Sequence, residues 1–143
     1  MNKAGKLRGD AQVALLAAYS LLALAAVGRS TYELIFKFDE APVAYSLSTF
    51  AALVYVIAVW AIWRGDRVGI IVGRIACTFE LVGVLTVGTL TVLGNDAFDV
   101  GTVWSFYGRD YGWLPLFVPA LALWWLFNQD TSPGISDSDT DSD

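Results

Sequence analysis

An acidic side chain inside a long apolar stretch is the strongest candidate for chemistry in this sequence. Glu80 lies about 12 positions after the start of the apolar residues 68–93, or about 18 Å along a helix, which is close to the midplane of a bilayer. A carboxyl group at that depth must be sheltered from lipid. It either carries a proton or cation during transport, or it hydrogen-bonds to another helix and holds the two in register. Both interpretations remain open from the sequence.

Partners for Glu80 should come from two other apolar stretches. If residues 11–27 and 43–63 cross the membrane in opposite directions, several hydroxyl groups lie within about one helical turn of its depth. Cys77 shares the helical face of Glu80, about one turn before it. The hydroxyl groups belong to Tyr19, Ser20, Ser48, Thr49 and Tyr55.

Charged and aromatic side chains gather in two connections expected on the outer side of the membrane. Residues 29–41 are interpreted as a continuation of the first helix at the membrane surface, and residues 94–112 form a longer, aromatic connection. Such residues either pack as a cap over the helices or form a site for a ligand or partner. The spacing of the acids matches no calcium loop, so we expect no metal site. The candidate residues are Arg29, Tyr32, Glu33, Asp39, Glu40, Asp96, Asp99, Trp104, Tyr107 and Arg109.

The residue inventory argues against several classes of function. The chain has no histidine and therefore no Ser-His or Cys-His nucleophile pair, and Cys77 is its single cysteine. Its 143 residues contain no phosphate-binding P-loop, no GxSxG nucleophile motif and no HExxH zinc motif. The basic stripe of a nucleic-acid-binding protein is also missing. We therefore expect a protein that is not an enzyme, with no cofactor and no nucleic-acid partner.

The apolar stretches themselves predict the fold class. Hydrophobic residues make up 56% of the chain and charged residues 16%, which is too apolar for a soluble domain. The sequence predicts an all-α fold: a bundle of four transmembrane helices within residues 11–127, covered by an extracytoplasmic loop cap. The four predicted spans are residues 11–27, 43–63, 68–93 and 113–127.

The flanking charges predict the direction of the chain. With residues 1–10 inside, five Lys and Arg side chains flank the spans on the inner side and three on the outer side. We therefore expect a multi-pass protein of a bacterial inner membrane, with both termini in the cytoplasm. Residues 128–143 carry five acids and almost no aliphatic side chain, which predicts a disordered acidic tail. Without these acids the net charge of −5 becomes zero.

Several short stretches resemble a family of small actinobacterial integral membrane proteins. They are Gly-Arg-Ser-Thr at 28–31, Lys-Phe-Asp-Glu-Ala-Pro-Val-Ala-Tyr at 37–45, Phe-Glu-Leu-Val-Gly-Val-Leu-Thr-Val-Gly-Thr-Leu at 79–90 and Thr-Val-Trp-Ser at 102–105. The resemblance covers about residues 10–127 and implies four membrane spans without an assigned activity. The 79–90 stretch is also similar to DoxX-like four-helix membrane proteins. Small multidrug transporters carry their essential acid in the first helix, where this chain has none, so their mechanism is not carried over.

Taken together, these features favour a non-enzymatic accessory or binding protein. Its partner would be a lipid, a small ligand or a membrane protein, including a second copy of the chain. The alternative is a small transporter, a carrier coupled to protons or cations that uses Glu80. A water-connected cavity at Glu80 would favour transport, whereas a dry hydrogen bond would favour a structural role.

Overall fold

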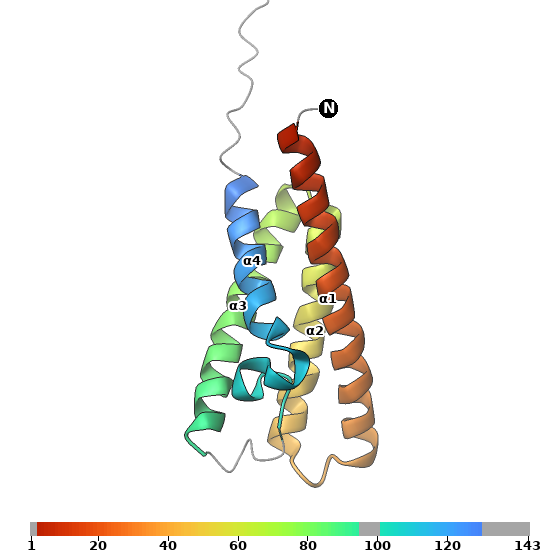
Figure 1. Cartoon of the computed structure of the whole chain (residues 1–143). Coiled ribbons are helices and arrows are strands. Elements are labelled where there is room, and N and C mark those ends of the chain that lie inside the picture. Colours follow the sequence, from red (N-terminus) through yellow and green to blue (C-terminus); the bar gives the residue numbers. More distant parts are fainter. Residues whose placement is uncertain (1–2, 95–100, 130–143) are drawn as a thin grey trace, which may run out of the picture.

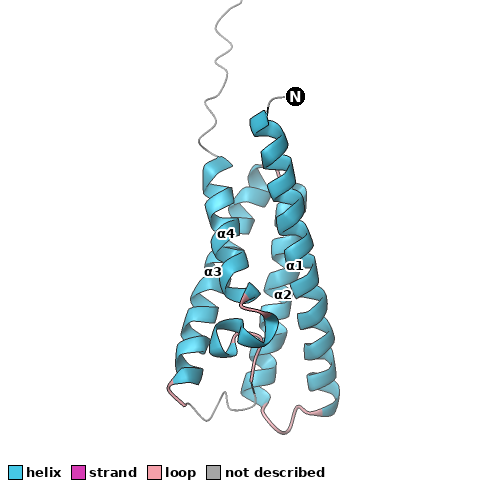
Figure 2. Cartoon of the chain, viewed as in Figure 1, coloured by secondary structure: helices cyan, strands magenta, loops and turns pink. Residues whose placement is uncertain are grey.

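The computed structural model describes residues 3–94 and 101–129, and all regular structure in these ranges is helical (Figure 2). Its α-helices run alternately up and down and form a bundle (Figure 1). The predicted all-α class is therefore confirmed. The elements are α1 (Lys3–Phe36), α2 (Pro42–Arg64), α3 (Arg67–Val92), the 3₁₀ helix η2 (Ser105–Tyr111) and α4 (Leu114–Asn128).

Local sequence signals explain the turn between α2 and α3. Pro42 begins α2 at a position where its missing N–H costs no hydrogen bond. Gly65 ends α2 with a φ of 65°, and its backbone N–H donates to the carbonyl of Ala61. Asp66 then caps α3, because its Oδ1 accepts a hydrogen bond of 2.8 Å from the backbone N–H of Gly69. This turn is encoded within a few residues.

Helix α1 is longer than the span predicted within it. Its 34 residues include residues 11–27 and continue as one helix through the predicted surface segment as far as Phe36. Arg29 and Glu33 support this continuation, since their side chains form an ion pair across one helical turn, with Nε and Oε1 2.6 Å apart. The residues that follow Phe36 form the turn into α2.

Helix α4 is much shorter than α3, and the residues before α4 make up the difference. Its 15 residues give about 22 Å of helix, against about 39 Å for the 26 residues of α3. Figure 1 shows η2 beside the helices, beyond the first residues of α4 and towards the end away from the N-terminus. Residues 102–105, which lead into η2, are buried. Of the connection that was expected to cover the bundle, residues 102–105 enter the bundle, and η2 continues the column of α4.

Arg74 joins α3 to the other end of α4. Its Nη2 donates to the carbonyl of Leu126 at 2.7 Å, and its guanidinium lies 4.7 Å from the centroid of the Phe127 ring. The last carbonyls of a helix carry partial negative charge, so a cation there is favourable.

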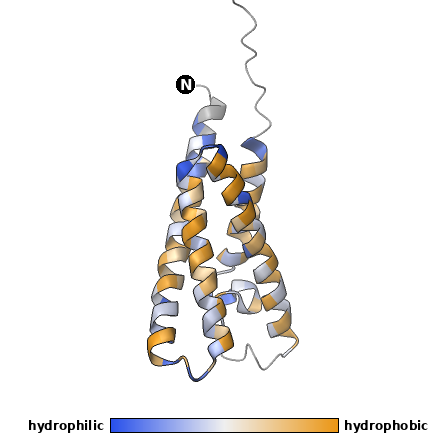
Figure 3. Ribbon diagram, turned by 180° about the vertical axis from the view of Figure 1, so that it is seen from behind, coloured by the Kyte–Doolittle hydropathy of each residue, from blue (hydrophilic) through white to orange (hydrophobic). Residues whose placement is uncertain are grey.

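The outer surface of the bundle is apolar, and an acid lies at its centre. The segment Arg8–Phe36 of α1, together with α2 and α3, is long and apolar enough to cross a membrane, and α4 is a shorter apolar helix. Large side chains such as Leu24, Ile75 and Trp124 are more than half exposed, whereas Glu80 is buried. Figure 3 shows hydrophobic residues along the length of the helices. These properties indicate an integral membrane protein.

Candidate functional site

Glu80 lies inside the bundle with its side chain fully enclosed. The exposed fraction is 0% for Glu80 and also for Tyr19 on α1. The Tyr19 hydroxyl donates to Oε2 of Glu80 at 2.9 Å, which joins α1 to α3. The same hydroxyl oxygen lies 3.2 Å from Sγ of Cys77, about one turn earlier on α3. One hydroxyl of α1 thus contacts two polar groups on the inner face of α3.

Tyr55 and Trp104 extend this arrangement to α2 and to the segment before η2. Nε1 of Trp104 donates to the Tyr55 hydroxyl at 3.0 Å. The ring centroids of Tyr55 and Tyr19 are 6.3 Å apart. The Trp104 indole rests against Gly83 of α3, where an added Cβ would lie 2.7 Å from Cζ3 of the indole. We refer to Tyr19, Tyr55, Cys77, Glu80 and Trp104 as the core polar cluster.

The residues whose hydroxyl groups were expected near Glu80 differ in their hydrogen-bond partners. Ser48 is buried, and its Oγ has no hydrogen-bond partner in the described part of the chain. Thr49 donates to the carbonyl of Tyr45 in its own helix at 2.9 Å. Ser20 is half-buried, and none of the described hydrogen bonds joins it to Glu80. Of the five hydroxyl residues expected near Glu80, Tyr19 and Tyr55 belong to the core polar cluster.

The surroundings of Glu80 permit hydrogen bonding and exclude water. Its Oε1 is buried and has no hydrogen-bond partner among the described residues. Because the side chain has an exposed fraction of 0%, no water-sized space adjoins the carboxyl group in this arrangement of the helices. Among the described residues, the hydrogen-bond contacts lead from Glu80 to the Tyr19 hydroxyl and from this hydroxyl to the Cys77 thiol, and both groups carry an exchangeable proton. By geometry the site is a dry hydrogen bond between helices.

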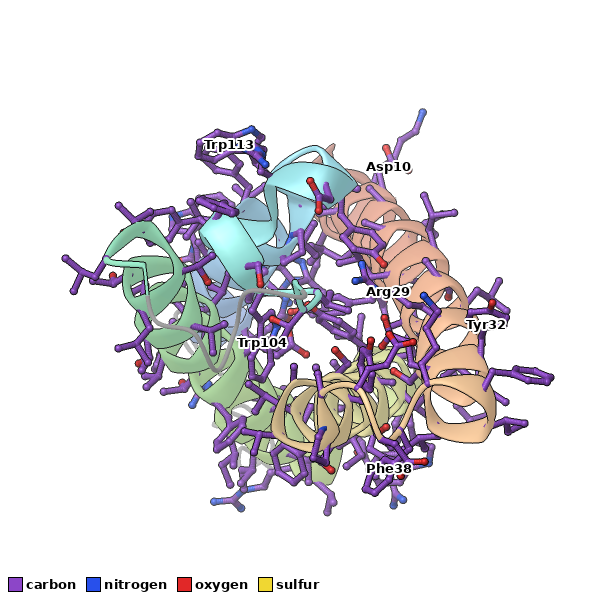
Figure 4. All side chains as sticks on the ribbon, turned by 90° about the horizontal axis from the view of Figure 1, so that it is seen from below. Asp10, Arg29, Tyr32, Phe38, Trp104 and Trp113 are labelled. Carbon is purple, nitrogen blue, oxygen red and sulfur yellow. The ribbon has the colours of Figure 1, made fainter. Side chains whose placement is uncertain are left out.

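Arg29 forms a second polar cluster at the end of the bundle where η2 lies. Besides its ion pair with Glu33, it donates from Nη2 to the carbonyl of Gly101 at 3.0 Å and from Nη1 to the Tyr111 hydroxyl at 3.4 Å. Figure 4, which looks at the bundle from this end, shows Arg29 directed inward from α1. Arg29 therefore ties α1 to Gly101, which precedes η2, and to Tyr111, the last residue of η2. Glu33 keeps one buried oxygen, Oε2, without a partner in the described ranges.

The remaining candidates on α1 and in the turn before α2 are exposed. The ring of Tyr32 contacts that of Phe36 in a tilted arrangement, with centroids 5.2 Å apart, and Tyr32 lies at the periphery of the bundle in Figure 4. Asp39 and Glu40 are exposed in the turn. Nothing in this geometry brings these side chains together with Arg29 around one pocket.

The candidates between α3 and α4 occupy several environments. The Tyr107 hydroxyl lies 3.0 Å from Oγ1 of Thr89, and Arg109 is exposed with its guanidinium 4.5 Å from the centroid of the Phe106 ring. Trp104 was grouped with the outer residues, but it lies in the core because Gly83 leaves room for its ring and Tyr55 accepts its N–H. Two further candidates, Asp96 and Asp99, lie outside the described residues.

Sequence reasoning missed the role of Tyr111 and of the Gly101 carbonyl as partners of Arg29. Neither has a signal in the sequence, because the contact depends on how residues 101–111 fold back onto α1. Gly83 was a usable signal. A glycine one turn from a buried acid indicates the close approach of another group, which proves to be the Trp104 ring.

The comparisons with known proteins provide no template for this site. No family model, curated protein or solved structure matches the chain. Within the described residues, no group of three or more His, Cys, Asp and Glu side chains could hold a metal ion. The geometry of the core polar cluster and of the surface therefore has to indicate the function.

Proposed function

We propose that this protein is a non-enzymatic accessory or binding protein of a bacterial inner membrane. The supporting observation is the enclosure of Glu80, which meets the hydroxyl of Tyr19 and no water-sized space. A carrier needs water or substrate to reach its acid from each side of the membrane in turn. A buried hydrogen bond between helices instead stabilises a single packing arrangement. The core polar cluster thus serves to hold the bundle, and binding takes place at other surfaces.

The partner in this proposal is a component of the membrane. The exposed side chains of all four α-helices are largely apolar, which suits a lipid, a ligand dissolved in the bilayer or a second membrane protein. A further copy of this chain belongs to the same class of partner.

The proposal places both termini on the cytoplasmic side. The N-terminal end of α1 and the last residues of α4 lie at the same end of the bundle (Figure 1). Arg8, Arg64, Arg67 and Arg74 also belong to this end, by their positions on α1, α2 and α3. An excess of basic residues is typical of cytoplasmic connections, which supports this orientation.

A proton- or cation-coupled carrier is the second candidate function. The supporting observation is Oε1 of Glu80, which is buried and has no partner in the described part of the chain. Native interiors rarely leave a carboxyl oxygen unsatisfied, so such an atom is a position where a proton or cation could be taken up. For transport, α1 and α3 would have to separate and break the hydrogen bond to Tyr19.

A proton-flux measurement distinguishes the two functions. Lipid vesicles containing the purified protein and an internal pH-sensitive dye receive a pH step, and the proton leak is compared with that of protein-free vesicles. We expect equal leaks for the wild type, for Glu80→Gln and for the control Glu40→Gln, which changes an exposed acid in the turn before α2. The opposite result would be a proton flux in the wild type that Glu80→Gln abolishes and Glu40→Gln leaves unchanged. This result would contradict a binding function and support a carrier.

A further inference from the structure

A groove of about 200 Å³ opens between α1 and α4 near the end of the bundle that carries the N-terminus. Helix α1 packs mainly on α2, and α4 packs mainly on α3, so the seam between α1 and α4 is the least closed side of the bundle. The groove lies in this seam and is reached from the side of the bundle. Its lining residues are Arg8, Ala11, Trp124, Trp125, Asn128 and Gln129.

The polar side chains of the groove suit an oxyanion. Arg8 is exposed and presents a guanidinium group, whose planar array of N–H donors matches the geometry of a phosphate. Asn128 and Gln129 add amide N–H donors from the last turn of α4. Among the described residues, none of those that line the groove is acidic. The donors come from both helices, so one bound anion would contact both sides of the seam.

The aromatic side chains of the groove suit the boundary between headgroup and acyl chain. Trp124 is 67% exposed near the end of α4, and indole rings favour the headgroup level of a membrane. Trp125 is buried in the wall of the groove, and its Nε1 has no hydrogen-bond partner in the described residues. An indole N–H can only donate, so it favours a ligand rich in acceptors, such as the phosphate and ester oxygens of a lipid.

Further basic side chains lie at the same end of the bundle as the groove, outside its lining, and favour an anionic ligand over a zwitterionic one. Arg67 and Arg74 lie on the first turns of α3 at the same end of the bundle. Arg64 also lies there, paired with Asp66 at 2.7 Å. A cluster of basic side chains at the cytoplasmic end of membrane spans attracts anionic headgroups.

We propose that the groove between α1 and α4 binds the headgroup of an anionic phospholipid, with its phosphate at the guanidinium group of Arg8 and the side-chain amides of Asn128 and Gln129. This inference rests on the proposed function, because it names the ligand class of a membrane binding protein. The bound lipid connects the two neighbouring helices that pack least closely and fills the open side of the bundle.

Native mass spectrometry of the full chain, released from nanodiscs of phosphatidylglycerol or of phosphatidylcholine, tests the proposal. We expect the wild type to retain phosphatidylglycerol in preference to phosphatidylcholine. Arg8→Gln should lower the retained phosphatidylglycerol at least about fivefold, the effect of one basic side chain near an anionic surface. The comparison variant is Arg67→Gln, which removes the same charge from an exposed position at the same end of the bundle but outside the groove, and which should lower retention less than Arg8→Gln does. Trp125→Phe keeps the ring, removes the N–H donor and should also lower retention.

Three results would overturn the proposal. Equal retention of the two lipids would remove the selectivity for an anion, and equal losses in Arg8→Gln and Arg67→Gln would show attraction by overall charge alone. If the protein retained lipid only after deletion of residues 130–143, the acidic residues of this segment, and not a lipid, would be the ligand of the groove in the full chain. Failure of the lipid site can be told apart from failure of the proposed function. A proton flux that depends on Glu80 would overturn the proposed function without altering lipid retention. A loss of lipid selectivity without any proton flux would overturn the lipid site alone.

Discussion

The hydrogen bond between Tyr19 and Glu80 joins two helices at a depth where lipid offers no alternative partner. Its donor and acceptor atoms lie 2.9 Å apart, and both side chains are fully enclosed. Loss of one partner leaves the other polar group buried without compensation, which costs more than the bond itself contributes. The pair therefore has a larger effect on folding than any exposed hydroxyl of the same type.

Substitutions at this pair should separate hydrogen bonding from ionisation. Glu80→Leu and Tyr19→Phe should each lower the free energy of unfolding by about 1–3 kcal/mol, because each leaves a buried partner unsatisfied. Glu80→Gln should retain most of the stability, since an amide oxygen still accepts from Tyr19. The measurement is unfolding in detergent micelles followed by circular dichroism. Tyr32→Phe is the matched control, as its side chain is 54% exposed; a Tyr19→Phe variant as stable as this control would contradict the role of the pair.

At the level of secondary structure, α3 is shaped to accept the chain that leads to α4. The rings of Trp104 and Tyr107 lie against Gly83 and Gly88, and a Cβ at either glycine would overlap with the ring. The short α4 needs this arrangement, because the residues before it must fill the end of the bundle that α4 does not reach.

Adding one methyl group to α3 should test this fit. Gly83→Ala should destabilise the protein by about 1–3 kcal/mol, because the new Cβ displaces the buried Trp104 indole. Gly28→Ala is the matched control: no atom lies within 4 Å of its added Cβ, so the variant should be neutral or slightly more stable. Combining Gly83→Ala with Trp104→Leu should cost less than the sum of the two single changes. Additive losses in thermal unfolding would show that the two positions are not coupled.

The turn between α2 and α3 should respond to acid. Hydrogen bonds from the Arg64 guanidinium and from the backbone N–H of Gly69 hold the pKa of Asp66 below its ordinary value. A lowered pKa in the folded state adds stability above the ordinary value of about 3.9, and this gain is lost as the pH falls through the folded pKa. Asp66→Asn keeps a capping side chain without the charge.

We therefore expect the melting temperature of the wild type to exceed that of Asp66→Asn at pH 7. The difference should shrink progressively once the pH falls below about 4. The control is Asp10→Asn, which changes an exposed acid near the same end of the bundle. A difference between wild type and Asp66→Asn that persists unchanged at pH 2 would contradict a contribution from the ionised carboxylate.

At the scale of the whole molecule, the single buried cysteine makes the proposed topology directly measurable. Cys77→Ser supplies a cysteine-free background, into which Asp39→Cys or Asp10→Cys is introduced at exposed positions near opposite ends of α1. With cytoplasmic termini, a membrane-impermeant maleimide should label position 39 in intact spheroplasts and position 10 only after lysis. The reverse pattern would invert the chain, and labelling of both positions in intact spheroplasts would argue against a spanning α1.

Much of the fold followed from the sequence because the relevant signals are local and add along the chain. Long apolar runs predict helices, since a backbone in lipid must satisfy its own hydrogen bonds. The depth of Glu80 followed from a rise of 1.5 Å per residue, and the same count placed Tyr19 and Tyr55 at its level. The ends of α2 were encoded in the same way by Pro42 and Gly65.

Only the tertiary structure decided which of these groups meet and where the long connection lies. Depth counting gives height but no rotation of one helix against another, so it could not separate Tyr19, which bonds to Glu80, from Thr49, which bonds within α2. Phe106 and Tyr107 adopt positive φ values of 48° and 61°, which few residues other than glycine accept and which local sequence does not predict. The contacts of residues 101–111 with α1, α2 and α3 offset that strain, and they exist only once the distant helices have assembled.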